Sequence, residues 1–353
     1  MKNGRLFLAA ALASSAGALQ AQGLEVKLSG QVNRGVMFVD DGLQSKSFHV
    51  DNDNSSTRFR FAGSADMMPG VKAGFLFETE YQSSPSNAVT FADRDGASPT
   101  LDERYVELYF DGRLGKLSMG QGDGAANGGV EVDLSGTSVI QYADVGATGG
   151  GFAFRTPGGA SGPVMAAVLS SQDFESRYDR LRYDTPSFAG ARLAASVGNK
   201  DSRDVSEAAL WYAADFGRAG RLAAALGWSK EDEALPGGVE DETIGGSVSW
   251  LAPGGFNLTY GRTQRDVAAD REGDFNYFKV GYKTGKHAFS VDYAMGDDQT
   301  AAGDEAKSMG IAYVFTPIGW AELFALAKRA QLDQPGVSYE DLTVMMVGTR
   351  LKF

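Results

Sequence analysis

The sequence contains no cysteine and only two histidines among its 353 residues. Without cysteine, the chain can form neither a disulfide nor a thiol-dependent catalytic centre. Proline is also scarce, with 10 residues, whereas glycine reaches 46 and aromatic residues make up 11% of the chain. This composition favours many strands and turns over disorder.

Long apolar runs are absent as well. Beyond the N-terminus, no segment approaches the roughly 18 consecutive apolar residues that a transmembrane helix needs, which excludes an all-helical membrane protein. The formal net charge is -12, with 45 acidic against 33 basic residues. An acidic balance of this size argues against a nucleic-acid partner.

The N-terminus has the layout of a secretory signal peptide. Lys2 and Arg5 precede an apolar run, and small residues follow it. We predict a signal peptide at 1–21, cut after Ala21, and a mature domain at 22–353. An earlier cut and a short buried helix are the alternatives. The chain is therefore expected to be exported, and losing two basic residues moves its net charge from -12 to -14.

Apolar residues alternate with small or polar residues through most of the mature chain. In "HAFSVDYAM", for example, His287, Phe289, Val291, Tyr293 and Met295 share one face of an extended segment. A period of two with one apolar face is typical of a half-buried strand. The same pattern predicts sixteen strands, near 24–40, 57–65, 71–82, 103–111, 114–121, 178–184, 190–198, 206–216, 220–231, 242–252, 255–265, 273–283, 287–296, 307–316, 320–330 and 339–353.

The connections between these strands alternate between short turns and longer polar stretches. Such a sequence describes an up-and-down meander. An even strand number, strands of about ten residues and this asymmetry match an outer-membrane barrel. We therefore predict an all-β fold: a transmembrane antiparallel β-barrel of 16 strands, with short periplasmic turns and long external loops. Closure would leave no unpaired strand edge in hydrocarbon.

Two segments and one other fold compete with this interpretation. On propensity alone, "WAELFALAKRAQ" at 320–331 favours a helix, and "SEAALWYAADFG" at 206–217 does so more mildly. We predict strands there because of their neighbours and the tight "TPIGW" turn. A secreted β-sandwich or β-helix would also show alternation, but aromatic residues near predicted strand ends favour a membrane girdle. The tryptophans at such ends are Trp211, Trp228, Trp250 and Trp320.

One connection, at 122–177, is much longer than the others and lacks a clear hydrophobic period. Loops of this length in a compact fold are usually functional. A barrel of sixteen strands encloses an aqueous channel, and a glycine-rich loop folded inward would narrow it. We predict an inward-folded constriction loop at 122–177, with a surface excursion as the alternative.

Five stretches carry a resemblance to a known family. "LSGQVNRGVMFVDDG", "TRFRFAG", "GKLSMGQ", "RYDRLRYDTPSFAG" and the terminal "GTRLKF" resemble the Gram-negative general porins, in the family's order and across the mature chain. The resemblance implies a homotrimer of sixteen-stranded barrels in the outer membrane, each with its own pore. It also implies that the third external loop folds inward, with acidic residues facing basic residues on the opposite wall.

The resemblance and the alternation suggest the residues of that constriction. Arg180 and Arg182 lie opposite Leu181 and Tyr183 in an extended segment, which turns both arginines to the lumen. The basic wall is predicted to contain Arg58, Arg60, Arg104, Arg180 and Arg182. The acidic loop is predicted to contribute Asp123, Glu131, Asp133 and Asp144. Within this set Arg104 conflicts with the strand pattern, which places it on the outer face with Val106 and Leu108.

Opposed charges across an aqueous gap would create a transverse field that orients dipolar solutes, while the width of the pore limits their size. The predicted function is passive diffusion of small hydrophilic solutes and ions. The acidic balance mildly favours cations, although the arginines could reverse this preference locally. The alternative is a substrate-selective channel, either for anions such as phosphate or for sugars.

An enzyme is not expected. There is no G-x-S-x-G or H-E-x-x-H motif, and neither His49 nor His287 belongs to a recognisable nucleophile–base pair. No cofactor is predicted. The acidic runs at 40–42 and 51–54 could bind Ca²⁺ through carboxylate oxygens, but a solvated acidic loop is the favoured interpretation.

The sequence finishes in an alternating segment, "TVMMVGTRLKF". We predict that Leu351 and Phe353 face lipid, that Arg350 and Lys352 face the lumen, and that this strand closes the barrel against residues 28–38. The family resemblance implies that Phe353 is an assembly signal for the barrel assembly machinery. Outer-membrane lipid and lipopolysaccharide are the other expected partners.

Overall fold

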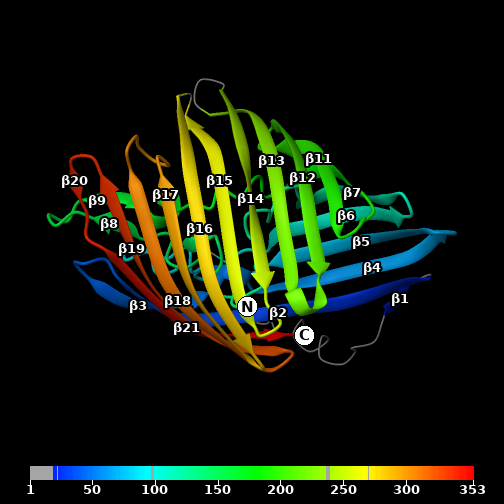
Figure 1. Cartoon of the computed structure of the whole chain (residues 1–353), viewed down its shortest axis with the longest axis horizontal. Helices are drawn as coiled ribbons and strands as arrows, with labels where there is room; N and C mark the ends of the chain where they lie inside the picture. The colour runs from blue at the N-terminus through cyan, green and yellow to red at the C-terminus, as the bar shows by residue number, and fades with distance from the viewer. Residues whose placement is uncertain (1–18, 22, 97–98, 236–238, 269) are drawn as a thin grey trace, which may run out of the picture.

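The computed structural model describes residues 19–353, except 22, 97–98, 236–238 and 269. Sixteen long strands in this described part form one closed antiparallel barrel (Figure 1). In chain order they are β2 (Leu24–Asp40), β4 (Arg58–Met68), β5 (Val71–Glu80), β6 (Asp102–Gly112), β7 (Gly115–Asp123), β10 (Arg177–Asp184), β11 (Ala191–Lys200), β12 (Arg203–Asp215), β13 (Arg221–Leu235), β14 (Val239–Leu251), β15 (Phe256–Ala268), β16 (Arg271–Thr284), β17 (His287–Asp297), β18 (Glu305–Ile318), β19 (Ala321–Gln334) and β21 (Leu342–Lys352). The predicted fold class and all sixteen predicted strands are confirmed.

The barrel closes between its first and last long strands. β21 pairs with β2 from Gln31↔Lys352 to Asp40↔Thr343. At the seam, the Gly30 N–H donates to the Phe353 carbonyl at 2.9 Å, and the Phe353 N–H donates to the Gly30 carbonyl at 3.0 Å. Paired backbone groups on both strands remove the free edge that hydrocarbon would not tolerate.

Strand pairing overrides helix propensity in β19. This strand pairs with β18 on one side and with β21 on the other, over most of its length. Its alanines and leucines alternate between the two faces: Leu323 is exposed outside, whereas Phe324 and Leu326 are buried inside. Alanine and leucine form good helices in isolation, but here two ladders of backbone hydrogen bonds and a two-sided environment decide the conformation.

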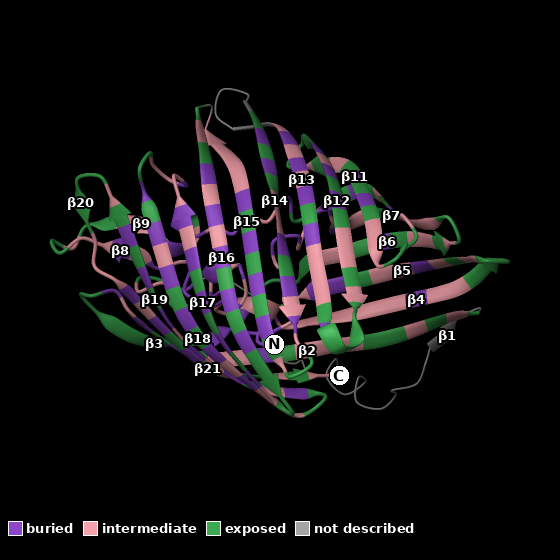
Figure 2. Ribbon diagram, viewed as in Figure 1, coloured by how far each residue is buried: buried purple, intermediate pink, exposed green. Residues whose placement is uncertain are grey.

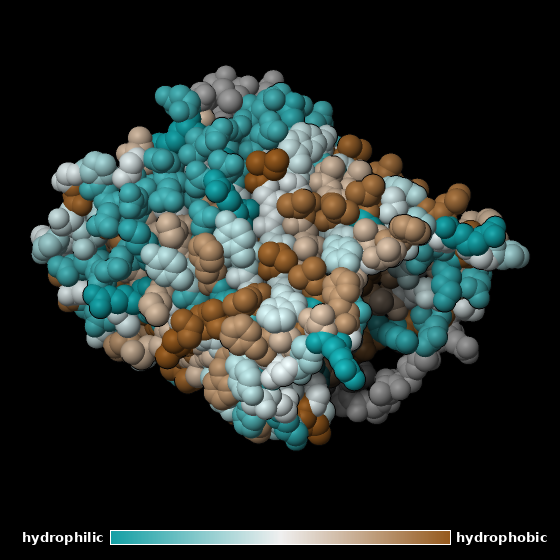
Figure 3. Space-filling model, in the orientation of Figure 1, coloured by the Kyte–Doolittle hydropathy of each residue, from teal (hydrophilic) through white to brown (hydrophobic). Residues whose placement is uncertain are grey.

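The two faces of the wall differ in kind. Along the front strands, buried and exposed residues alternate in bands (Figure 2). In β17, Phe289 and Val291 are exposed outside, whereas Ser290 and Asp292 are buried inside. In Figure 3, apolar residues form a band across the face from lower left to upper right, and hydrophilic residues cover the upper and left-hand parts. The wall is therefore apolar outside, as a lipid-facing barrel requires. Its inner face is mixed, with polar residues such as Ser290 and Asp292 and apolar residues such as Phe324.

Several elements were not predicted from the sequence. β3 (Ser45–Asp51) lies in the predicted loop 41–56 and pairs antiparallel with residues 34–40 of β2. The long connection contains a short hairpin, β8 (Ala153–Arg155) with β9 (Ser161–Val164), followed by the four-residue helix α1 (Met165–Val168). Short strands of this kind carry too little periodicity to be recognised. In the part of the chain that the structure describes, helices are too short to cross a membrane.

The predicted signal peptide falls mostly on residues 1–18, which lie outside the described residues. Its last three residues form β1 (Leu19–Ala21), which pairs with Leu24–Val26 of β2. The cleavage after Ala21 stays a prediction.

The seam leads to a test of closure. A Cβ placed on Gly30 would lie 2.5 Å from Cζ of Phe353 and 2.7 Å from the carbonyl oxygen of Arg58. Gly30→Val should therefore displace the terminal ring or the strand, at a cost of about 1–3 kcal/mol, as for other overpacked sites. We expect a lower temperature for the loss of the compact barrel on semi-native gels. Leu28→Val, two residues earlier on the same exposed face, is the control; equal melting of both variants would contradict the packing argument.

Candidate pore constriction

The long connection between β7 and β10, residues 124–176, packs against the inward-facing side of the wall. Ile140, Phe152 and Met165 of this connection are at most 1% exposed. They share one apolar cluster with wall residues that include Phe275 of β16 and Val344 of β21. The core of this protein therefore lies between the connection and one side of the barrel, which leaves open space on the other side.

A buried ion pair anchors the connection to β16. The Nζ of Lys279 lies 2.8 Å from Oδ2 of Asp133, and the two side chains are 0% and 2% exposed. Lys279 also donates to the Gln141 carbonyl at 2.6 Å. One wall ammonium thus holds two points of the connection. Asp133 faces this lysine rather than a row of arginines.

Neutral wall side chains bind the backbone of the connection at further points. Ser247 and Ser249 of β14 accept hydrogen bonds from the N–H groups of Val132 and Leu134, at 3.0 and 2.9 Å. Trp211 of β12 donates from Nε1 to the Ala125 carbonyl at 3.0 Å. The indole of Trp211 therefore points inward, and its predicted place in the outer aromatic girdle was wrong.

A polar cavity of about 870 Å³ lies beside the connection. In the part of the chain that the structure describes, its lining includes six acidic residues and five arginines, together with Tyr105 and Tyr142. The acids are Asp53, Glu80, Asp123, Glu131, Asp144 and Asp173. The arginines are Arg58, Arg104, Arg177, Arg265 and Arg350. A wet, charged hollow of this kind suits hydrated polar solutes.

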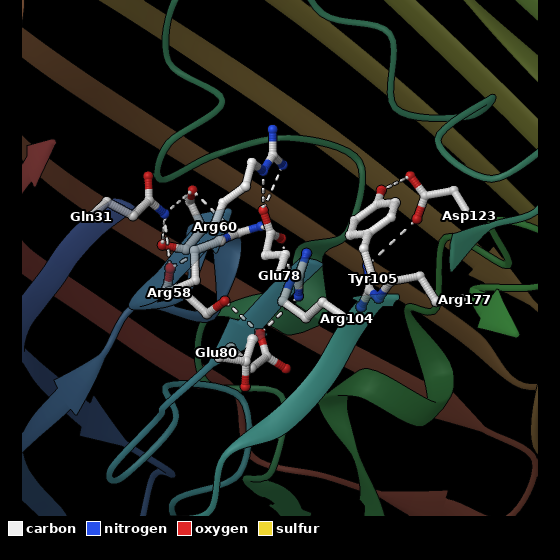
Figure 4. A network of polar contacts seen from close by, with 12 residues as sticks. Gln31, Arg58, Arg60, Glu78, Glu80, Arg104, Tyr105, Asp123 and Arg177 are labelled. Carbon is white, nitrogen blue, oxygen red and sulfur yellow. Dashed lines mark hydrogen bonds and ion pairs between the residues drawn. The ribbon is translucent and has the colours of Figure 1, made fainter. Parts of the chain in front are cut away.

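One wall of the cavity is a network around Glu78 (Figure 4). Its carboxylate accepts from Arg104 Nε at 2.7 Å, and it lies 2.5 Å from Arg60 Nη2 and 3.4 Å from Arg58 Nη1. Arg104 also donates to Glu80 at 2.7 Å. Glu78 is buried, and its single carboxylate partly neutralises the guanidinium groups of Arg58, Arg60 and Arg104.

The structure corrects the strand pattern at Arg104. Simple alternation places this side chain on the outer face, whereas it reaches Glu78 and Glu80 inside the barrel. The register explains the difference: Glu78 opposes Tyr105 and Thr79 opposes Glu103, so Arg104 is an extra residue in β6. A β-bulge of this kind re-aims a side chain. A single bulge is invisible to a period-two analysis.

The predicted site residues separate into two groups. Those that line the cavity are Arg58, Arg104, Asp123, Glu131 and Asp144. The second group does not line the cavity. In it, Arg60 pairs with Glu78 and Asp133 pairs with Lys279. Arg180 and Arg182 also belong to this group and bind groups of the barrel wall.

Arg180 and Arg182 face inward, as alternation predicts, but they do not line the cavity. Arg180 is 3% exposed in its side chain and pairs with Glu107. Arg182 pairs with Asp184 at 2.9 Å and donates to the Gly124 carbonyl at 2.7 Å. Arg180 binds β6 and β7 through Glu107 and the Asp123 carbonyl, whereas Arg182 fastens the start of the connection to β10.

Several lining residues were not predicted as part of the site. Arg350 was predicted to face the lumen, and it does so, donating to Glu322 at 2.6 Å and to Ser55 at 2.8 Å. Alternation along β15 could have suggested Arg265. Asp53 begins a one-turn 3-10 helix, Asp53–Ser55, and Asp173 lies outside helices and strands. Neither segment carries a period, so only the folded chain brings these acids to the cavity.

Burial changes the acidity of the carboxyl groups outside the strands. It raises the pKa of Asp53 to about 6, with the charges of Asp144 and Glu80 adding to the effect. It raises the pKa of Asp173 to about 7, although this carboxylate accepts from the N–H groups of Val130 and Gly128. The pKa of Glu131 is raised by burial first and by Asp173 second. Asp53 and Asp173 therefore change charge near neutral pH.

The two histidines and the acidic runs show no catalytic or metal-binding arrangement in the described residues. His287 stacks on Phe315 at the start of β17, and His49 is an exposed residue of β3. Among these described residues, no group of three or more His, Cys, Asp or Glu side chains is placed to hold a metal ion.

An apolar outer surface, a closed sixteen-stranded wall within the described residues and a charged inner cavity define a membrane-spanning channel. A profile of the Gram-negative porins matches residues 8–316. The chain belongs to the Gram-negative porin family, and it is an outer-membrane channel for diffusion. A search of curated proteins finds no match.

Solved structures share this fold at low sequence identity. The anion-selective porin from Comamonas acidovorans has a TM-score of 0.65 and 19% identity, and covers 94% of this chain and 100% of its own. OmpT of Vibrio cholerae in its trimer form has a TM-score of 0.60 and 13% identity, with 94% and 100% coverage. The outer-membrane channel DcaP of Acinetobacter baumannii has a TM-score of 0.57 and 12% identity, with 96% and 100% coverage.

The anchor can be tested by a double-mutant cycle. Lys279→Met should leave Asp133 buried without its cation, and breaking such a pair costs on the order of 3–5 kcal/mol. We expect a lower urea midpoint and noisier single-channel currents, because the connection loses two attachments. The double variant Lys279→Met/Asp133→Leu should recover part of the stability. If the double variant loses as much as the two single variants together, the pair is not the anchor.

Proposed function

We propose that the cavity beside residues 124–176 is the narrowest part of the pore, and that small hydrophilic solutes and ions diffuse through it. The observation that carries this proposal is the arrangement of charge around one hollow. Glu131 and Asp144 come from the connection, whereas Arg58 and Arg104 come from β4 and β6. A connection fastened to one side of a sixteen-stranded barrel would narrow the aqueous channel without filling it.

Selection by this constriction needs no chemical step. Fixed charges on two sides of a water-filled gap orient dipolar solutes and disfavour apolar ones, and the width of the gap limits their size. The residues proposed to form the gap on the arginine side are Arg58 and Arg104. Arg60, Arg180 and Arg182 act as supports of the wall, because each is held by neighbouring acids or carbonyl groups.

The remaining partners are proposed from the family. We propose a homotrimer in outer-membrane lipid and lipopolysaccharide, reached by export through the signal peptide 1–21. Phe353 is proposed to be read by the barrel assembly machinery; its ring lies at the exposed end of the seam. No enzymatic activity and no cofactor are proposed for this chain.

A channel selective for one anion or for a sugar is the alternative. The porin from Comamonas acidovorans is named as anion-selective, and arginines line the cavity here as well. Saturable block of the ionic current by one solute at low concentration would favour this alternative over general diffusion.

Solute size provides a direct test of the constriction. Tyr142 lies on the connection and lines the cavity, so Tyr142→Ala should widen the gap. In liposome swelling with uncharged sugars, we expect the rate to rise most for sugars near the size limit and least for the smallest. Tyr293→Ala, on the exposed outer face of β17, is the matched control. Unchanged swelling by Tyr142→Ala for every sugar would contradict the proposed constriction.

The oligomeric state can be measured separately. We expect the protein extracted in mild detergent to show three times the chain mass by native mass spectrometry. A monomer in every detergent that retains channel activity would contradict the homotrimer.

A further inference from the structure

A second hollow, of about 410 Å³, lies inside the barrel on the side that carries the short turns. Val132 of the connection lines it, and so do Ser187 and Gly190 of the turn between β10 and β11. Glu131, the residue before Val132, lines the charged cavity instead. The hollow therefore adjoins the proposed constriction, and its volume suits a small molecule.

Small apolar side chains of two neighbouring strands form the floor of this hollow. Ala213 of β12 and Ala223 of β13 are partners in the ladder, and both line the hollow. Each lies on the inner face, because it is two residues from an inward side chain, Trp211 in β12 and the buried Ala225 in β13. Methyl groups at these positions leave room that larger side chains would fill.

The indole of Trp211 forms one side of the hollow. Its N–H donates to the Ala125 carbonyl, so the ring is held in place although the residue is only half-buried. A fixed aromatic ring is a stacking surface for another flat ring. Its partner in the ladder is Arg192 of β11, whose guanidinium carbon lies 5.8 Å from the centre of the indole. An aromatic face and a cation therefore border the same space.

The charge beside the indole is positive. Arg192 lies 2.5 Å from Asp184, and Arg182 lies 2.9 Å from the same carboxylate. Among the described residues, no other carboxylate oxygen lies within 4.0 Å of either guanidinium. The Arg192 side chain is 36% exposed and, within the described part of the chain, donates one hydrogen bond, to Asp184. Because a guanidinium has five N–H groups, Arg192 keeps donors for a solute.

The lining disfavours several kinds of solute. A sugar ring needs hydrogen-bond partners on several sides, whereas the described lining offers mainly methyl groups, the indole face and one guanidinium. A phosphate dianion would lose its water against the alanines and gain only that guanidinium. An organic cation would be repelled by the positive charge. A flat apolar body with a single carboxylate avoids all of these penalties.

We propose that this hollow is a weak binding site for small aromatic carboxylates such as benzoate. The ring of the solute packs against the indole of Trp211 over the alanine floor, and its carboxylate accepts hydrogen bonds from Arg192. The inference rests on the proposed function in one respect, because solutes reach the hollow by way of the constriction. Weak binding holds such solutes beside the constriction without trapping them.

The test is saturation-transfer NMR of benzoate with the full chain in detergent. We expect saturable binding with a dissociation constant in the millimolar range, because the site is open and the ligand is small. Benzyl alcohol has the ring without the charge, and acetate has the charge without the ring. Each should bind about threefold or more weakly than benzoate. Glucose that displaces benzoate at lower concentration than benzyl alcohol does would identify a sugar site and overturn the inference.

Two substitutions separate the parts of the site. Ala223→Leu should fill the hollow and leave Trp211 and Arg192 in place, so we expect benzoate to bind about tenfold more weakly or worse. Arg192→Gln should weaken benzoate binding by about three- to tenfold and leave benzyl alcohol unchanged, because only the carboxylate uses the guanidinium. Equal weakening of both ligands by Arg192→Gln would show that this arginine only supports the wall.

Matched controls make the same chemical changes elsewhere. Ala62→Leu adds the same bulk to β4, two residues from the inward Arg60. Arg113→Gln removes a positive charge from the exposed turn between β6 and β7. Neither Ala62 nor Arg113 lines the hollow, and we expect both controls to bind benzoate as the unaltered chain does. A loss of binding in a control as large as in its partner variant contradicts the assignment.

The binding measurement and the pore measurement can fail separately. A chain that passes ions and small sugars but binds benzoate no more tightly than acetate contradicts this inference and leaves the diffusion pore standing. A chain that binds benzoate in detergent but conducts nothing in bilayers contradicts the proposed function, and leaves the binding site without a role in transport.

Discussion

The attachment of the long connection to one side of the barrel determines the rest of the interior. Lys279 and Asp133 form a pair that is closed to solvent, and the serines of β14 bind the neighbouring backbone. A buried ammonium is costly unless a carboxylate and further acceptors surround it, and here the connection supplies both. Because the apolar core lies between the connection and β16–β21, the opposite half of the lumen stays open to water.

Charge inside the barrel is arranged in two ways. Arginines of the wall have acids beside them, which stabilises a dense cluster of like charges around Glu78 and positions the side chains. Among the described acids outside the strands, Asp53 and Asp173 accept hydrogen bonds from neutral donors. Asp133 and Glu175 of the connection instead form ion pairs with lysines of the wall. The paired charges thus hold the side chains of the wall in place around the cavity.

The sequence was sufficient for the barrel but only partly for the site. Strands in a two-sided environment repeat every two residues, so their number and approximate positions could be predicted, even in β19 where propensity favours a helix. Alternation fails at Arg104, because one extra residue in β6 turns this side chain from the outer to the inner face of the wall. Asp53 and Asp173 reach the cavity from segments outside the strands, and the pairing of Asp133 with Lys279 joins residues 146 positions apart. No local pattern records such contacts.

The closing seam has a consequence for the order of folding. β2 and β21 pair across roughly 300 positions of sequence, whereas most other neighbours in the wall are joined by a turn or loop. Contacts between distant residues form late, because the entropy of closing a long loop is lost before any contact rewards it. β2 must therefore keep one edge unpaired while the rest of the wall assembles, and whatever shields that edge controls how fast the barrel matures.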